Sequence, residues 1–463
     1  MTETGHNLNQ GFVDQLIVLL GEEKVSTAKA VLEDHGQDES YHPGKAPDVV
    51  AFPETTEDVS ALVKLCAAHK VPVIPYGVGT SLEGHIAALK GGVCIDLSRM
   101  NQILRVNAED LDVVVQPGVT RRQLASYIRD TGLFFSVDPG ADATLGGMAA
   151  TRASGTTTVR YGTMRDNVLS MEVVMPDGRV VRTGSRARKS STGYDLTHLM
   201  VGSEGTLGVI TELTLKLHGV PEAITAAVCT FETLSGAVQT VIEAIQMAVP
   251  VARIELLDAK SIEAVKQYSK LDIEVGPTLF FEFHGSESEA EHTAETVKAL
   301  ALENGGRSFN WSSEQGDRDR LWRARHDAYY ASRASCPGKE GYVGDVCVPI
   351  SQLSTAIEKS QALLDESPYP TFILGHVGDG NFHFLIFIDT DNPSQIADAQ
   401  ALSEKIVALG QDLEGTCSGE HGIGHGKMNA LEKEYGDALD MMRAIKRGID
   451  PDNIMNPGKI LRL

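Results

Sequence analysis

The sequence predicts an α+β protein with two main parts, and three observations lead to this prediction. Strand, helix and strand patterns follow one another over residues 48–75, as in a β-α-β unit. The chain contains 45 glycines, which gather in a few loops, a pattern typical of backbone that packs closely around a ligand. After about residue 221, strand patterns alternate with long helical patterns, which favours an antiparallel sheet with helices. A chain of 463 residues also exceeds one ordinary core, so two or three domains are expected.

The first 45 residues predict a helical segment in front of the β-α-β unit. Ser26 is expected to cap a second helix in this segment, which ends before Gly36. Such a segment serves either for docking or for contact between copies, so a homo-oligomer is one expectation. The apolar residues at helical spacing in the first helix are Phe12, Leu16, Leu19 and Leu20.

The remaining elements follow from periodicity and turn chemistry. Asp177-Gly178 predicts a hairpin turn, because both residue types reach the backbone angles that tight hairpins need. In the first part we expect a strand at 48–52, a helix at 56–69, a strand at 71–75 and a later strand that ends near Leu217. In the second part we expect strands at 223–231 and 278–283 and helices at 234–247, 287–302 and 318–332.

Charge and cysteine usage exclude several classes of protein. The net charge is −22 at pH 7, which argues against nucleic acid or an anionic membrane as partner. The one basic run, at 179–189, is interpreted as a solvated hairpin tip. The six cysteines lack short pairings, which favours a reduced, cytoplasmic setting and excludes a cysteine-ligated iron–sulfur cluster of the usual spacing. The N-terminus has no basic start followed by an apolar core and no Arg-rich amphipathic pattern, so neither a signal peptide nor a transit peptide is expected, and no apolar run is long enough to span a bilayer.

Residues 375–383 predict a metal-binding hairpin. They lie between two apolar runs that read as strands, and residues 378–381 supply turn chemistry. If those four residues form the turn, His376 faces His383 with Cβ atoms about 5 Å apart, close enough for both imidazoles to hold one ion. The alternative is the polar end of an ordinary hairpin.

A second glycine-rich loop, at 417–426, places Glu420 directly before His421. With His376 and His383, Glu420 would complete a set of two histidines and one carboxylate. Such a set leaves coordination positions open for substrate, as catalytic sites require. The expected ion is zinc or manganese.

Two further glycine loops, at 76–84 and 138–150, carry hydroxyl side chains and are expected to present backbone N–H groups to phosphate. Leu82 stands where a Rossmann fingerprint needs its third glycine, so that fold is not expected. Two such loops about sixty residues apart suit a pyrophosphate held from both sides. A plain connecting loop remains the alternative for each.

The motifs at 77–84, 139–148 and 202–208 resemble the FAD domain of the vanillyl-alcohol-oxidase superfamily. Within it the chain is most similar to the branch of cytochrome-type D-lactate dehydrogenases, related to the glycolate oxidase flavin subunit and D-2-hydroxyglutarate dehydrogenase. The resemblance covers nearly the whole chain and implies non-covalent FAD, because no histidine occupies the loop position used by the berberine-bridge branch. It implies FAD contacts from Pro75, Gly77, Gly79, Thr80, Ser81, Pro139, Gly140, Thr144, Gly147, Gly155, Glu204, Ile210 and Asn456.

The same resemblance implies a domain organisation. The N-terminal segment at 1–45 is followed by the FAD-binding domain at 46–220. A substrate or cap domain with the metal site occupies 221–430. The C-terminal segment at 431–463 returns to the FAD domain near the isoalloxazine ring.

The resemblance implies that Arg325, in a Leu-Trp-x-x-Arg pattern, binds the substrate carboxylate, for which a planar guanidinium is well shaped. On the residues alone, a surface helix with charge pairs among Arg323, Arg325 and Asp327 is the alternative. Hydroxyglutarate dehydrogenases have a lysine where Val343 stands and an asparagine where Leu385 stands. The apolar pair in this chain cannot repay the desolvation of a second carboxylate, so we expect a monocarboxylate substrate.

The expected activity is oxidation of a D-2-hydroxy acid, foremost D-lactate, to the 2-oxo acid. Metal must first acidify the hydroxyl, because histidine near pKa 6.5 cannot deprotonate an aliphatic alcohol unaided. His421 is expected to be the general base, with His425 or a role of His421 as metal ligand as the alternatives. Electrons then pass to a quinone, a cytochrome or an electron-transfer flavoprotein. The alternative functions are a glycolate or D-2-hydroxyglutarate dehydrogenase, a non-redox transferase of the alkyl-glycerone-phosphate synthase type, and a non-catalytic flavoprotein subunit.

Overall fold

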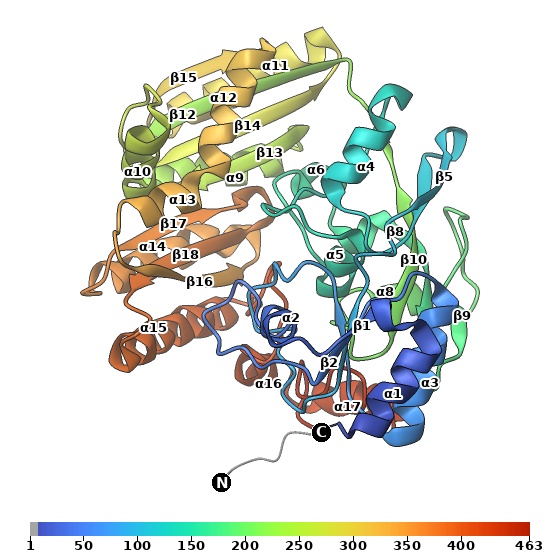
Figure 1. Ribbon diagram of the computed structural model, residues 1–463. Coiled ribbons are helices and arrows are strands. Elements are labelled where there is room, and N and C mark those ends of the chain that lie inside the picture. The colour runs from blue at the N-terminus through green and yellow to red at the C-terminus, as the bar shows by residue number, and fades with distance from the viewer. Residues whose placement is uncertain (1–7) are drawn as a thin grey trace. The chain divides into compact units, whose positions relative to one another are not determined.

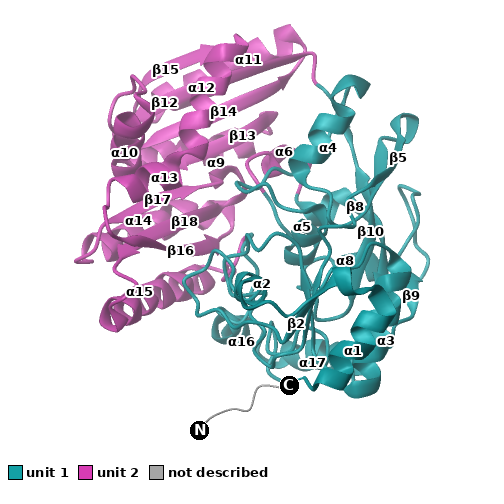
Figure 2. Cartoon of the chain, viewed as in Figure 1, with its two compact units in different colours: residues 1–154, 163–220, 420–463 teal, residues 155–162, 221–419 magenta. Residues whose placement is uncertain are grey.

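The computed structural model describes residues 8–463, so the first seven residues of the expected 1–45 segment lie outside the described residues (Figure 1). The described chain forms two compact units (Figure 2). Unit 1 holds the residues up to Ser154, together with Thr163–Val220 and Glu420–Leu463. Unit 2 holds Gly155–Gly162 and Pro221–Gly419.

Unit 1 begins with helix α1, Gln10–Leu20, whose first turn is capped by the Asn9 side chain accepting from the Phe12 N–H. Phe12, Leu16 and Leu20 are buried as predicted, but Leu19 is 41% exposed. The predicted role of Ser26 is wrong. Ser26 lies in strand β1, Val25–Ser26, where it pairs with Val50, and α2, Lys29–Asp34, begins only after Ala28.

The β-α-β unit is confirmed. Helix α3, Thr56–His69, has the predicted bounds and is capped by Thr55. Strands β2, Val49–Ala51, and β3, Val73–Tyr76, both run parallel to β4, Val93–Asp96, in a sheet of order β1-β2-β4-β3. The apolar face of α3 and that of α1 pack on this sheet. The C-terminal residues join it, since the Val73 N–H donates to the Ile454 carbonyl at 2.8 Å.

A second, antiparallel sheet in unit 1 has the order β5-β6-β10-β8-β9. The predicted Asp177-Gly178 hairpin is confirmed, with Gly178 in the left-handed region at φ +79°. The strands are β5 Ile103–Asn107, β6 Asp112–Val115, β8 Val168–Val174, β9 Val180–Arg182 and β10 Val209–Lys216, and β7 Leu133–Phe134 pairs separately with β11 His218–Gly219.

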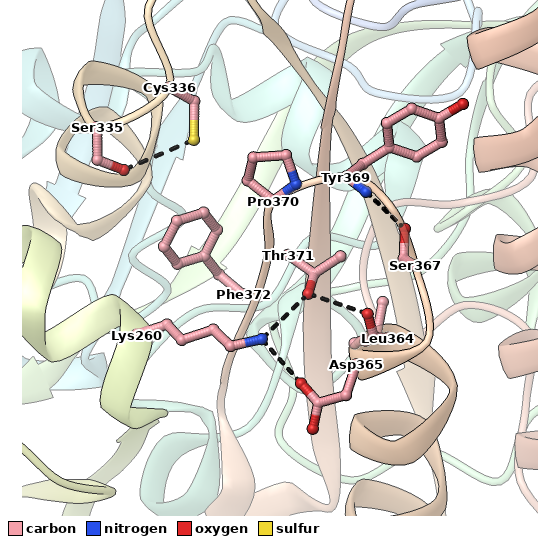
Figure 3. A pocket seen from close by; sticks show the side chains of 10 residues that line it. All are labelled: Lys260, Ser335, Cys336, Leu364, Asp365, Ser367, Tyr369, Pro370, Thr371 and Phe372. Carbon is pink, nitrogen blue, oxygen red and sulfur yellow. Dashed lines mark hydrogen bonds and ion pairs between the residues drawn. The ribbon is translucent and has the colours of Figure 1, made fainter.

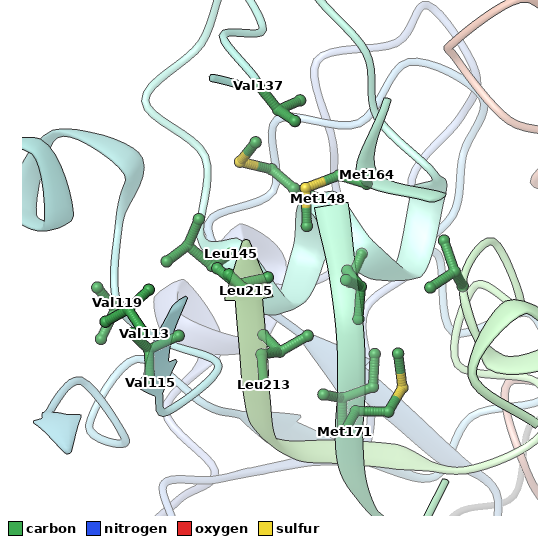
Figure 4. Packing of buried hydrophobic residues seen from close by; sticks show 14 of the residues in the cluster. Val113, Val115, Val119, Val137, Leu145, Met148, Met164, Met171, Leu213 and Leu215 are labelled. Carbon is green, nitrogen blue, oxygen red and sulfur yellow. The ribbon is translucent and has the colours of Figure 1, made fainter. Parts of the chain in front are cut away.

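Helix α5, Leu145–Thr151, packs on this second sheet (Figure 4). Its Leu145 and Met148 meet Val113, Val115 and Leu213 from the strands in one apolar core. The glycine-rich loop before α5 is therefore held on a rigid support. The other helices of unit 1 are α4 Arg121–Ile128, α7 Met164–Asn167, α8 Leu196–Met200, α16 Met428–Tyr435 and α17 Leu439–Ile449.

Unit 2 is built on a seven-stranded sheet of order β15-β12-β14-β13-β17-β18-β16, in which every pairing is antiparallel. This confirms the antiparallel α+β cap. Its strands are β12 Ala223–Phe231, β13 Val251–Leu257, β14 Thr278–Gly285, β15 Gly306–Ser312, β16 Glu340–Cys347, β17 Thr371–Gly375 and β18 Asn381–Ile388.

The helices of unit 2 are α6 Thr158–Tyr161, α9 Leu234–Gln246, α10 Ala259–Ser269, α11 Glu287–Glu303, α12 Gln315–His326, α13 Ala328–Ala334, α14 Leu353–Asp365 and α15 Pro393–Asp412. The single helix predicted at 318–332 is in fact two, because α12 ends and α13 begins around Asp327, where ψ is −3°. Helices α10, α12 and α13 supply side chains to one core with Phe280, Leu385 and Phe387 of the sheet. They cover the face of the sheet that carries the candidate site. Among residues 8–463, no helix has both the length and the apolar character needed to cross a membrane.

Candidate functional site

The two histidines of the predicted hairpin do meet, but by a different register. The residue paired with His383 is Leu374, and not His376 as expected. The reason is that the connection is longer than a four-residue turn: His376 already leaves the strand, a short 3-10 turn spans Val377–Asp379, and Gly380 takes a positive φ of +77°. His376 therefore lies diagonally from His383, and the two ring centroids are 5.3 Å apart.

Each histidine has a carboxylate neighbour in the sheet. Nδ1 of His376 lies 2.7 Å from Oε1 of Glu255, and Nδ1 of His383 lies 3.5 Å from Oδ1 of Asp345. Both carboxylates are fully buried. For His376, a carboxylate that accepts a hydrogen bond from Nδ1 leaves Nε2 with the lone pair that binds a metal, as in many metal sites.

Sequence reasoning missed Glu255 and Asp345. A usable signal existed, because each is a carboxylate inside a run of otherwise mostly buried strand residues, where an ionisable group needs a partner.

Glu420 follows directly on Gly419, the last residue of unit 2. The preceding loop is anchored beside the histidines, because the Ser418 hydroxyl donates to Asp345 at 2.9 Å.

His376, His383 and Glu420 offer ligand atoms that all lie within 4.8 Å of one another. Oε2 of Glu420 also accepts from the Ser154 hydroxyl at 2.6 Å. Two imidazoles and one carboxylate are a donor set that suits zinc, manganese or iron, so the residues present fit a divalent metal.

Arg325 is buried on α12, with 6% of its surface exposed. Its guanidinium Nη2 donates to Oε2 of Glu255 at 2.6 Å, so the alternative of a surface charge pair with Asp327 does not hold. Its Nε is also buried and finds no hydrogen-bond partner among the described residues. A buried N–H group of this kind can donate a hydrogen bond to a carboxylate oxygen of a ligand.

Val343 and Leu385 pair directly across β16 and β18, two residues along the strands from the Asp345–His383 pair and therefore on the same face. Leu385 is 1% exposed, Val343 is half-buried, and both lie in the apolar core with Trp322. The surroundings on this side of the histidines are therefore apolar.

His421 belongs to unit 1, where its Nδ1 lies 3.9 Å from Oε1 of Glu83. The Glu83 carboxylate also meets Lys427 at 3.2 Å and is itself buried. The competing base His425 has a pKa lowered to about 4, first by burial and then by the electrostatic effect of the neighbouring His42 and Lys459 side chains. A base of that strength is poorly matched to reaction near neutral pH.

The two glycine loops predicted to hold a pyrophosphate touch within unit 1. A Cβ on Gly77 would lie 2.3 Å from Oγ1 of Thr144, so only glycine allows this approach. Gly79 has a φ of +71°. Thr144 caps α5, but the N–H groups of Leu145 and Gly146 donate to carbonyls of the protein, at Val119 and Pro117.

The remaining predicted FAD contacts are distributed over both units. Gly155 lies in unit 2, whereas Pro75, Thr80, Ser81, Pro139, Gly140, Gly147, Glu204, Ile210 and Asn456 lie in unit 1. The hydroxyl of Ser81 donates to Asp38 at 2.9 Å. Asn456 donates from Nδ2 to the carbonyls of His85 and Glu204, which fixes the C-terminal segment beside the glycine loops.

A separate cavity of about 340 Å³ lies on the unit 2 surface (Figure 3). Its lining includes Lys260, Cys336 and Phe372, and Lys260 bridges to Asp365 at 2.8 Å. These residues differ from the predicted site residues, so the cavity is not part of the candidate site.

Comparison with known proteins defines the class. The FAD binding domain family matches residues 47–184, and the family described as FAD linked oxidases, C-terminal domain, matches residues 220–460. The chain belongs to the FAD-linked oxidase family, so it is a flavin-dependent oxidoreductase with FAD as its cofactor.

Several relatives cover most of the chain. It is 50% identical to a probable mitochondrial D-lactate dehydrogenase of Danio rerio, over 96% of this chain and 90% of that protein. It is 45% identical to a mitochondrial cytochrome-type D-lactate dehydrogenase of Arabidopsis thaliana, over 95% and 80%. The fold matches p-cresol methylhydroxylase with a TM-score of 0.82 at 20% identity, over 98% of each chain. The predicted superfamily, branch and fold class are thereby confirmed.

The prediction of a cytoplasmic protein is wrong. The similar D-lactate dehydrogenases of Danio rerio, Arabidopsis thaliana and Saccharomyces cerevisiae are all mitochondrial proteins by name. Scattered cysteines indicate a reducing environment, and the cytoplasm shares such an environment with other compartments. The cysteine pattern therefore could not distinguish the cytoplasm from those compartments.

Proposed function

We propose that the protein is an FAD- and metal-dependent dehydrogenase that oxidises a D-2-hydroxy monocarboxylate, foremost D-lactate, to the 2-oxo acid. The observation that carries this proposal is the donor set of His376, His383 and Glu420, with Arg325 joined to His376 through the shared carboxylate of Glu255. The names of the relatives at 45 to 50% identity support the substrate.

Arg325 would bind the carboxylate of the substrate. Its buried Nε, together with the charge of the guanidinium, suits one carboxylate oxygen, and a charge-assisted hydrogen bond of this kind is strong in a dry site. Val343 and Leu385 would face the remainder of the substrate. Their apolar surface fits a methyl group and opposes a second carboxylate, which supports lactate over a diacid.

The two histidines and Glu420 would hold a divalent metal, which would supply Lewis acidity to the substrate hydroxyl; a fall of about five units in the pKa of that hydroxyl would be worth about 7 kcal/mol. FAD supplies the hydride acceptor. His421, adjacent to Glu420 in the chain, would take the hydroxyl proton. The paired loops at Gly77 and Thr144 would hold non-covalent FAD by its pyrophosphate. A cytochrome is the favoured electron acceptor, because the relatives from Arabidopsis thaliana and Saccharomyces cerevisiae are cytochrome-type enzymes by name.

Glycolate is the second candidate substrate. A glycolate oxidase subunit of Bacillus subtilis is 31% identical over 96% of this chain. Anaerobic mixing of the FAD-loaded protein with D-lactate, L-lactate, glycolate and D-2-hydroxyglutarate tests the proposal by bleaching of the flavin absorbance. D-lactate is expected to bleach fastest. Absence of bleaching with every 2-hydroxy acid would refute the proposed function.

A further inference from the structure

Glu255 on β13 connects the two parts of the candidate site. Its side chain is fully buried, and its two oxygens are divided between two partners. Oε2 accepts from Nη2 of Arg325 at 2.6 Å, and Oε1 lies 2.7 Å from Nδ1 of His376. A buried carboxylate is tolerated only when it is paired and hydrogen-bonded in this way.

The sheet register explains why one residue reaches both partners. Leu257 pairs with Leu374 on β17, so Glu255, two residues earlier, points to the same face as His383, the partner of Leu374 on β18. Arg325 on α12 reaches Glu255 on this same face of the sheet. The position of Glu255 thus follows from strand pairing and not from any flexible segment.

The chemistry of a carboxylate decides the protonation of its partners. An ionised carboxylate only accepts hydrogen bonds, so His376 must donate from Nδ1, and its Nε2 then carries the lone pair. That is the tautomer a metal requires. The second oxygen holds the guanidinium of Arg325 in one orientation.

We propose that Glu255 is a positioning residue that fixes His376 in its metal-binding tautomer and orients Arg325 towards the substrate carboxylate. This inference rests on the proposed function, since it assumes that His376 holds a metal. One buried side chain then sets the geometry of the metal and of the carboxylate-binding group together.

Glu255→Gln separates this role from simple packing. Glutamine has the same shape but only one acceptor oxygen, while both neighbours need an acceptor. Because the guanidinium is always a donor, the amide oxygen should face Arg325 and the amide NH₂ should face Nδ1 of His376. His376 must then accept at Nδ1 and carry its proton on Nε2, where it cannot bind a metal.

Glu282→Gln is the matched control. Glu282 lies on the neighbouring strand β14 opposite Arg253, and it is 6% exposed. Its Oε1 lies 2.7 Å from Nε2 of His284 and 3.4 Å from Nε of Arg253. It is therefore another buried carboxylate shared between a histidine and an arginine, but its histidine is not in the predicted ligand set.

The experiment is a titration of chelator-treated, FAD-loaded protein with Mn²⁺, with FAD content and melting temperature measured on each variant. Glu255→Gln is expected to bind Mn²⁺ about 10- to 100-fold more weakly than the wild type, the range seen when a partner of a metal ligand is lost. Glu282→Gln is expected to bind as the wild type does. Wild-type affinity in a folded Glu255→Gln variant would overturn the inference while leaving the proposed function standing.

Glu255→Asp keeps two acceptor oxygens and is expected to lose less metal affinity than Glu255→Gln. A loss in the aspartate variant equal to that in the glutamine variant would assign the effect to shape and overturn the inference. If Glu255→Gln does not fold, the aspartate variant carries the test, and complete loss of Mn²⁺ binding in it overturns the inference. A wild-type protein that binds no Mn²⁺ would refute the metal of the proposed function and the inference with it.

Discussion

His85 and Glu204 form an ion pair in the interior of unit 1, with Nε2 of His85 3.4 Å from Oε1 of Glu204. Burial lowers the pKa of His85, but the nearby negative charge of Glu204 outweighs it, so the pKa is raised. Burial raises the pKa of Glu204, but His85 and the N–H groups of Ile423 and Gly424 outweigh it, so the pKa is lowered. The pair thus joins the first glycine loop, the loop at 202–208 and the loop that carries His421.

This pair predicts a pH window for stability. The contribution of Glu204, whose pKa is depressed, is present above its unfolded value of about 4.3 and is lost as pH falls through the folded value. The contribution of His85, whose pKa is raised, is present below about 6.5 and is lost as pH rises through the folded value. The stabilisation from the pair should therefore be greatest between about pH 4.3 and 6.5.

Glu204→Gln tests this window. Removing one partner of a buried pair is expected to cost about 3 to 5 kcal/mol of unfolding free energy. The loss of that free energy below about pH 4.3 and above about pH 6.5, measured by chemical denaturation, should be smaller in the variant than in the wild type. Asp195→Asn is the control, since the exposed Asp195–His198 pair should contribute at most about 1 kcal/mol. An unchanged pH profile in Glu204→Gln would contradict the prediction.

Removal of the metal is the second prediction. Dialysis against EDTA is expected to abolish oxidation of D-lactate, with FAD retained, because the glycine loops at Gly77 and Thr144 are separate from the histidine hairpin in the chain. His376→Ala and His383→Ala should each purify with less zinc or manganese by elemental analysis. Full activity after chelation, in protein without metal by the same analysis, would show that the histidine hairpin is only structural.

The third prediction concerns the base. His421→Ala is expected to reduce the rate of flavin reduction by about 10² to 10⁴, the usual contribution of a general base, while FAD stays bound. His425→Ala is the control, because the lowered pKa of His425 makes it a weak base. Single-turnover reduction followed in a stopped-flow instrument separates this step from reoxidation. Normal reduction in His421→Ala together with slow reduction in His425→Ala would exchange the two roles.

Sequence predicted what depends on local pattern. The bounds of α3 and the hairpin at Gly178 follow from capping, periodicity and turn chemistry, all of which act over a few residues. The error at His376 was also local: the connection is longer than the expected four-residue turn, so the partner of His383 moved by two positions, from His376 to Leu374, and a shift of two residues keeps the same face.

What sequence could not supply depends on distant pairing. Glu255 and Arg325 are 70 positions apart in the chain, and their contact exists only because α12 packs on the face to which Glu255 points. Similarly, Asp345 meets His383 through strand register alone. A carboxylate in an apolar strand indicates that a polar or charged partner must lie nearby, but it does not identify that partner.

The last prediction is that Val343 controls the choice between a monocarboxylate and a diacid. Val343→Lys would place a lysine two residues along β16 from Asp345, the partner of His383, and because Val343 is only half-buried, the lysine stem can reach out without unfolding the sheet. The ratio of kcat/KM for D-2-hydroxyglutarate to that for D-lactate is expected to rise by about tenfold or more, which corresponds to at least about 1.4 kcal/mol. Val343→Met is the control, because it adds volume without charge and should lower kcat/KM for both substrates together.

Leu385 is a poorer choice for the test, since a polar residue at its fully buried position would also cost stability. Faster turnover of the diacid by the wild type would contradict the role assigned to both residues.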